Sequence, residues 1–63
     1  MARYQLTDGK TVETSYPAIP GAIAFETKGP DGEVVSNVTK YGKEATDTLR
    51  DLMLAAALRR VFA

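Results

Sequence analysis

One long C-terminal helix is predicted by residues 43–62, which read KEATDTLRDLMLAAALRRVF. Neither Gly nor Pro interrupts this stretch, and at 1.5 Å per residue a helix of this length spans about 30 Å. Glu44 and Asp47 lie near its start and Arg59 near its end, so their charges complement the helix dipole. Gly42 precedes the stretch and is an acceptable N-cap. The rest of the chain is therefore expected to pack against this helix.

Two opposite faces of the predicted helix are apolar. With about 100° between successive residues, the first face follows most of the helix and is expected to pack on a sheet. Its members are Ala45, Leu49, Leu52, Met53 and Ala56. The opposite face is polar over the first turns and apolar beyond residue 52. Its apolar members are Leu54, Leu58, Val61 and Phe62.

This second apolar face is the predicted partner interface. A helix that is apolar all round is normally buried all round, and one sheet covers one side only. The remaining side must meet the loop at residues 17–21, a second copy of the chain, or another protein. The loop offers Ile19 as its one large apolar side chain for this purpose. We predict a protein–protein surface, most simply a homodimer through the helix, and keep burial under the loop as the alternative.

Short alternating stretches before the helix predict β-strands, because apolar residues recur at every second position. The expected strands are residues 3–7, 11–16, 22–28 and 33–40, each bounded by turn residues. The prediction is one α+β domain over residues 1–63. In it, an antiparallel meander of three to four short strands packs against one long C-terminal helix, in the order ββββα.

The register of the first predicted hairpin follows from its turn. A three-residue loop, Thr7-Asp8-Gly9, places Tyr4 opposite Val12 and leaves Gly9 in the left-handed conformation that Gly adopts at little cost. A two-residue loop would put the apolar residues of the two strands on opposite faces. We prefer the three-residue loop.

Two rules conflict in the second predicted hairpin. The turn chemistry of residues 29–32 favours a three-residue loop ending in Gly32, which would set Phe25 opposite Asn37. The apolar pattern favours a four-residue loop, with Ile23 opposite Val38 and with residues 28 and 33 forming a charge pair. We prefer the four-residue loop and leave the register open.

Composition provides little for catalysis or for metal binding. The 63 residues include neither His nor Cys, the side chains that most often serve as general bases, nucleophiles and transition-metal ligands. No carboxylates are spaced so that they must converge. The chain is predicted to be non-enzymatic, without cofactor or metal. A domain this small usually needs additional support, and without disulfides or metal the remaining support is a second subunit.

The alternative function is nucleic-acid binding by the sheet. Aromatic side chains for base stacking would be Tyr4, Tyr16 and Phe25, and the candidate basic contacts are Arg3, Lys10 and Lys28. Against this reading, the 8 basic and 8 acidic residues give zero net charge, so no positive field attracts phosphates. The same aromatics also lie in phase with Leu6 and Val12, which makes them core candidates.

The predicted location is the cytoplasm, and no membrane partner is expected. The first residues contain no apolar run that resembles a signal peptide. The longest wholly apolar stretch, residues 52–58, is far shorter than the roughly 20 residues that a membrane-spanning helix needs.

Overall fold

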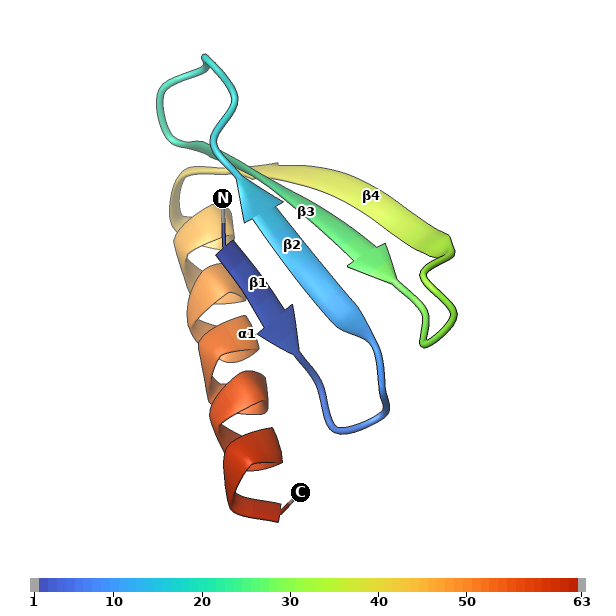
Figure 1. Cartoon of the computed structure of the whole chain (residues 1–63). Coiled ribbons are helices and arrows are strands. Elements are labelled where there is room, and N and C mark those ends of the chain that lie inside the picture. Colours follow the sequence, from blue (N-terminus) through green and yellow to red (C-terminus); the bar gives the residue numbers. More distant parts are fainter. Residues whose placement is uncertain (1, 63) are drawn as a thin grey trace.

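The computed structural model describes residues 2–62, except for the side chains of Arg60 and Phe62. Its strands are β1 (Ala2–Gln5), β2 (Thr11–Ser15), β3 (Ala22–Lys28) and β4 (Val34–Tyr41), and its helix is α1 (Gly42–Phe62). The strands form an antiparallel sheet in the order β1-β2-β3-β4, and α1 packs on one face of it (Figure 1). The predicted ββββα arrangement is confirmed.

The β1–β2 hairpin has the predicted three-residue loop. Leu6 N–H donates to the Lys10 carbonyl at 2.9 Å, and Gly9 N–H donates to the Leu6 carbonyl at 3.2 Å. Tyr4 lies opposite Val12, as expected. Gly9 has a φ of +86°, which is the left-handed conformation that the loop requires at this position.

The β3–β4 hairpin uses the same turn. Gly29 N–H donates to the Glu33 carbonyl at 2.8 Å, and Gly32 N–H donates to the Gly29 carbonyl at 2.9 Å. Gly32 repeats the φ of +86°. Glu33 N–H donates to Asp31 Oδ1 at 3.0 Å. In the first turn Lys10 N–H donates to Asp8 Oδ1, also at 3.0 Å. A Pro-Asp-Gly or Thr-Asp-Gly sequence therefore builds one turn twice.

A β-bulge lies beside the second turn: Thr27 pairs with Ser36 and Lys28 with Val34, so Val35 of β4 is the extra residue. A bulge sets two residues of one strand against one of its partner and so changes the register. Beyond the bulge Phe25 lies opposite Val38, whereas the three-residue loop without a bulge would place Phe25 opposite Asn37. The extra residue preserves both the turn and the apolar pairing on one face.

The four-residue loop preferred from the sequence is therefore wrong. Ile23 lies opposite Lys40 rather than Val38. Lys28 lies opposite Val34 rather than Glu33. The physical reason is that the left-handed Gly and the Asp side chain hold the turn with hydrogen bonds. A single bulge restores the apolar pairing without breaking those bonds.

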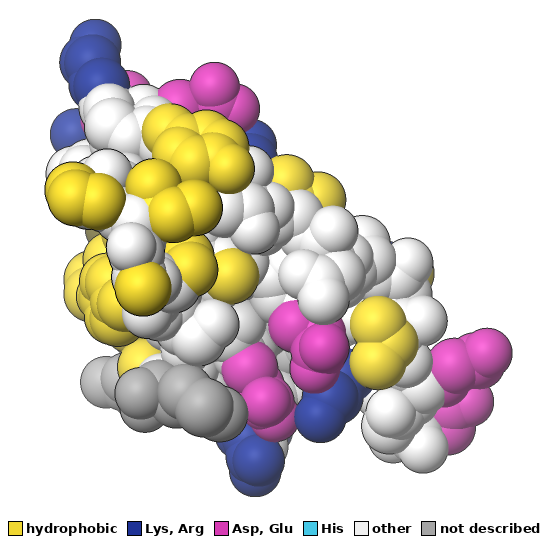
Figure 2. Space-filling view, turned by 90° about the horizontal axis from the view of Figure 1, so that it is seen from above, with side chains coloured by type: hydrophobic (Ala, Val, Ile, Leu, Met, Phe, Trp, Pro, Cys, Tyr) yellow, Lys and Arg dark blue, Asp and Glu magenta, His cyan; other side chains and the backbone are white. Residues whose placement is uncertain are grey.

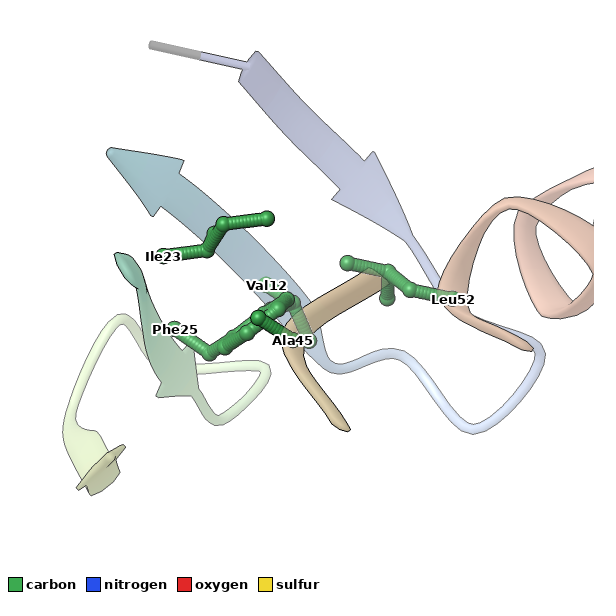
Figure 3. Close-up of a cluster of buried hydrophobic side chains, with 5 residues drawn as sticks. All are labelled: Val12, Ile23, Phe25, Ala45 and Leu52. Atoms are coloured by element: carbon green, nitrogen blue, oxygen red, sulfur yellow. The ribbon is translucent and has the colours of Figure 1, made fainter. Parts of the chain in front are cut away.

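The core lies between α1 and the face of the sheet that carries Val12 (Figure 3). Its buried members are Val12, Ile23, Phe25, Ala45 and Leu52, with Tyr4, Leu6 and Leu49 partly buried against them. Ala56 is also buried. Met53, which was expected on this face, is 49% exposed. It lies about 80° around the helix from Ala45, at the edge of the face and beyond the reach of the sheet.

α1 crosses the sheet obliquely. It begins directly after β4 and its later turns pass beside β1 (Figure 1), and it contacts β1, β3 and β4. The β2–β3 loop lies at the start of the helix, where Gly42 N–H donates to the Gly21 carbonyl at 2.8 Å. The half of β4 next to the β3–β4 turn is left without a helix over it.

The two turn glycines provide a test of the hairpin geometry. Both have φ +86°, but a Cβ at Gly9 would lie 3.3 Å from Pro30 Cγ, whereas none of the described atoms lies within 4 Å of one at Gly32. We expect Gly32→Ala to lower the free energy of unfolding by about 1–2 kcal/mol, the cost of a left-handed residue with a Cβ. Gly9→Ala should cost more, and urea denaturation measures both. As a control, Asp8→Ala should cost less than either, and equal small losses in all three would contradict the assigned turns.

Candidate interaction surface

The predicted interface residues on α1 are exposed. Leu54, Leu58 and Val61 are 59%, 51% and 73% exposed, and their spacing places them on one side of the helix, opposite Leu52 and the sheet. We call these three residues the helix stripe. The fourth predicted member, Phe62, has a side chain outside the described residues. The stripe is contiguous, which distinguishes it from single exposed apolar residues that occur on any surface.

The β2–β3 loop does not cover the helix stripe. The loop lies at the start of α1, whereas the stripe lies on its last turns, at the opposite end of the molecule (Figure 1). Ile19, the residue considered as a cover, is itself 51% exposed. Hydrophobic side chains are also exposed around the end that carries the loop (Figure 2). The alternative of burial under the loop is therefore wrong.

A second apolar surface lies on β4, and sequence reasoning missed it. Its exposed apolar residues are Val34, Val35, Val38 and Tyr41. On the helix side of the sheet, Val38, Thr48 and Leu52 help to line a groove of about 210 Å³ between β4 and α1. The signal was present in the sequence, since two apolar phases run through residues 34–41. In the sequence those phases bear only on the register of the hairpin, and the structure shows that the strand is also uncovered.

The basic residues considered for nucleic-acid binding are all paired with carboxylates. Arg3 lies 3.2 Å from Glu13 and Lys28 lies 3.3 Å from the same carboxylate. Lys28 also lies 3.7 Å from Glu26. Arg3, Glu13 and Glu26 face one another across β1, β2 and β3 on the side of the sheet away from α1. This open face therefore carries a mixed ion-pair network.

Lys10 lies apart from that network, and its ammonium is 3.7 Å from Asp8 in the β1–β2 turn. The candidate stacking residues do not join the basic ones either. Phe25 is buried in the core and Tyr4 packs against it, while Tyr16 is exposed beyond the end of β2. The three predicted basic contacts and the aromatics are thus on different parts of the molecule.

The Glu13 carboxylate is the electrostatic centre of the open face. Its pKa lies below the ordinary value of 4.5. The hydrogen bond from Lys28 Nζ is the main cause, and the charges of Lys28 and Arg3 lower the pKa further against the opposing effect of burial. Glu13 is therefore ionised at neutral pH and holds both cations in place.

The part of the chain that the structure describes holds no group of three or more carboxylates that could bind a metal ion. Nor do residues 2–62 contain a helix with the length and apolar character needed to cross a membrane. Comparison with protein-family models, curated proteins and solved structures finds no match to this chain. The exposed surfaces described above are therefore the features of the molecule that bear on its function.

The lowered pKa of Glu13 predicts how stability changes with pH. A carboxylate with a lower pKa in the folded state contributes stability that is fully present above its unfolded pKa. That contribution is lost as the pH falls from about 4.5 through the folded value. We expect the urea midpoint to fall over this range in the wild type and less steeply in Glu13→Gln. Identical pH profiles for the two proteins would contradict the role of this ion-pair network.

Proposed function

We propose that this chain is a small non-enzymatic binding module that acts through a protein–protein surface, and that the helix stripe is that surface. The observation that carries the proposal is the exposure of Leu54, Leu58 and Val61 along one side of α1. A regular helix holds these side chains in fixed positions, so the surface needs little ordering when a partner binds. Exposed contiguous apolar surface on a small domain is characteristic of an interaction site.

A second copy of the chain is the partner that the helix supports best. A two-fold axis near Leu58 would set two α1 helices antiparallel and bring Leu54 of one copy beside Val61 of the other. Arg50 and Asp51 lie about one helical turn before Leu54, outside the region in which the two stripes would overlap. A two-fold contact makes one apolar surface complementary to itself.

Association through the helix stripe would also stabilise the fold. Burying a Leu or Val side chain contributes roughly 1.5–3 kcal/mol, and the buried core of this chain is small. The described core contains Ile23, Phe25 and Leu52 as its largest aliphatic and aromatic members. Association through the stripe would add a comparable apolar contact and support a chain whose size alone gives marginal stability.

The alternative proposal, nucleic-acid binding by the sheet, receives less support. Arg3 and Lys28 would have to leave Glu13 to contact phosphates, and Phe25 is unavailable for stacking because it is buried. If the sheet bound single-stranded nucleic acid, affinity would fall steeply with salt and would drop in Lys28→Glu. A gel-shift titration at low salt with wild type and Lys28→Glu compares the two proposals directly.

The helix proposal is tested by Leu58→Glu. We expect the mass of the particle in solution to fall, because a carboxylate at the centre of the stripe would be buried without a partner. The melting temperature should fall at the same time, by an amount that depends on protein concentration. Sedimentation equilibrium and thermal unfolding at high micromolar concentration measure the two effects.

Thr46→Glu is the matched control. Thr46 is exposed on the same helix but lies outside the stripe, so the same charge there should leave the mass unchanged. A wild-type monomer whose melting temperature does not respond to Leu58→Glu would contradict the proposal. Equal effects of Leu58→Glu and Thr46→Glu would also contradict it, because they would indicate a general effect of charge on the helix.

A further inference from the structure

The outer edge of β4 is a long strand edge without a partner in the described chain. The sheet order β1-β2-β3-β4 makes β1 and β4 the two edges. β1 has 4 residues and β4 has 8. Natural sheets usually protect a long edge with charges, Pro or a covering element, because its free N–H and C=O groups can pair with another strand. Across residues 34–41 the sequence has no Pro and one charged residue, Lys40.

The backbone groups that face outward can be assigned. Gly42 N–H donates to the Gly21 carbonyl, and this pair continues the register in which Ile23 lies opposite Lys40 and Phe25 opposite Val38. Hydrogen-bonded pairs alternate with non-hydrogen-bonded pairs in an antiparallel ladder. Residues 38 and 40 therefore bond to β3. The outward N–H and C=O groups belong to Asn37, Thr39 and Tyr41.

We propose that β4 pairs with β4 of a second copy, antiparallel and about a two-fold axis through Val38, so that two sheets become one. A two-fold axis normal to the sheet keeps the helices of both copies on the same side. Residues that lie opposite each other must then belong to the same face of the joined sheet. Their numbers are therefore both odd or both even, so the axis passes between the two copies of one residue. With Val38 on the axis, the outward groups of Asn37 lie opposite those of the partner subunit's Thr39, and the two residues form a hydrogen-bonded pair on each side of the axis.

The side chains are complementary in this register. Val38 lies opposite the partner subunit's Val38 in a non-hydrogen-bonded pair, where side chains approach most closely. On the other face, Asn37 lies opposite the partner subunit's Thr39, so two polar side chains that face solvent are paired. The two exposed Val38 side chains thus meet each other at the axis, beside the groove that Val38 and Leu52 help to line.

No like charges meet in this arrangement. Lys40 lies opposite the partner subunit's Ser36, and the two Lys40 residues are separated along the paired strands. Each Lys40 ammonium lies 3.4 Å from Glu44 of its own chain. An axis through Asn37 is less favourable, because it sets Val38 opposite Ser36 and Lys40 opposite Val34. The axis through Val38 is the register that pairs apolar with apolar.

This interface is separate from the helix stripe, which lies on the last turns of α1 and away from β4 (Figure 1). The two proposals can therefore be tested independently. In Leu58→Glu protein the helix contact is removed, and we expect a dimer held by β4 alone. In that background, Val38→Lys places two ammonium groups opposite each other at the axis and should halve the particle mass. Sedimentation equilibrium measures each mass.

Asn37→Pro provides a second change at the backbone. It removes an outward N–H, whereas the hydrogen bonds of β4 to β3 are kept, since Pro is tolerated on an edge strand in this orientation. In the Leu58→Glu background it should also halve the mass, and Asn37→Ala should not. A monomeric Leu58→Glu protein, or a mass that neither Val38→Lys nor Asn37→Pro changes, overturns the β4 proposal.

Amide hydrogen exchange separates loss of pairing from loss of folding. In the Leu58→Glu protein, the Asn37 and Thr39 amides should exchange slowly, although they would face solvent in a monomer. Adding Val38→Lys should make them exchange fast while the amides of residues 38 and 40, bonded to β3, remain slow. Fast exchange at Asn37 and Thr39 before Val38→Lys is added would overturn the proposal.

Discussion

The width of a single helix limits what this sheet can bury. An α-helix with its side chains is about 10–12 Å across, whereas four strands spaced about 4.8 Å apart are wider. α1 must also begin directly after β4 and cross toward β1, so its cover is oblique. Ala45 and Leu52 close the core over Val12, Ile23 and Phe25. The inner face of β4 toward the β3–β4 turn then remains open, and so does the outer side of the helix.

The molecule is consequently divided into surfaces of different character. The face of the sheet away from α1 is held by ion pairs that converge on Glu13, and its mixed charges keep that face hydrated. Most of the exposed large apolar side chains of the described residues are on α1 and on β4. The associations proposed above through α1 and through β4 rest on this distribution of exposed apolar side chains.

Much of the fold followed from local patterns. The Asp-Gly turns, the uninterrupted helix and the phase of Tyr4 with Val12 were each readable within a few residues, and the structure has them. The register of β3 with β4 was not readable, because the bulge at Thr27 and Lys28 arises from competition between a good turn and a good apolar pairing. Met53 was misplaced for a similar reason, since a helical wheel does not give the width of the facing sheet.

The exposure of the helix stripe was predictable, but the uncovered state of β4 was not. Apolar residues around the whole of α1 exceed what one sheet can cover, and that excess is visible in the sequence. By contrast, the valines of β4 resemble those of a buried strand. Only the oblique path of α1, set by its direct connection to Tyr41, shows that Val38 remains 45% exposed. Local sequence carries no information about that path.

The repeated turn also has a kinetic consequence. Every strand pairs with its neighbour in the chain, so the sheet is built from contacts of short sequence separation, which are associated with fast folding. Isolated hairpins form in about 1–10 μs, and the Pro30-Asp31-Gly32 turn, held by its own hydrogen bonds, starts the pairing of β3 with β4. While the chain folds, β4 is therefore unpaired on both sides only until this hairpin forms. This shortens the time in which its valines can aggregate with those of other chains.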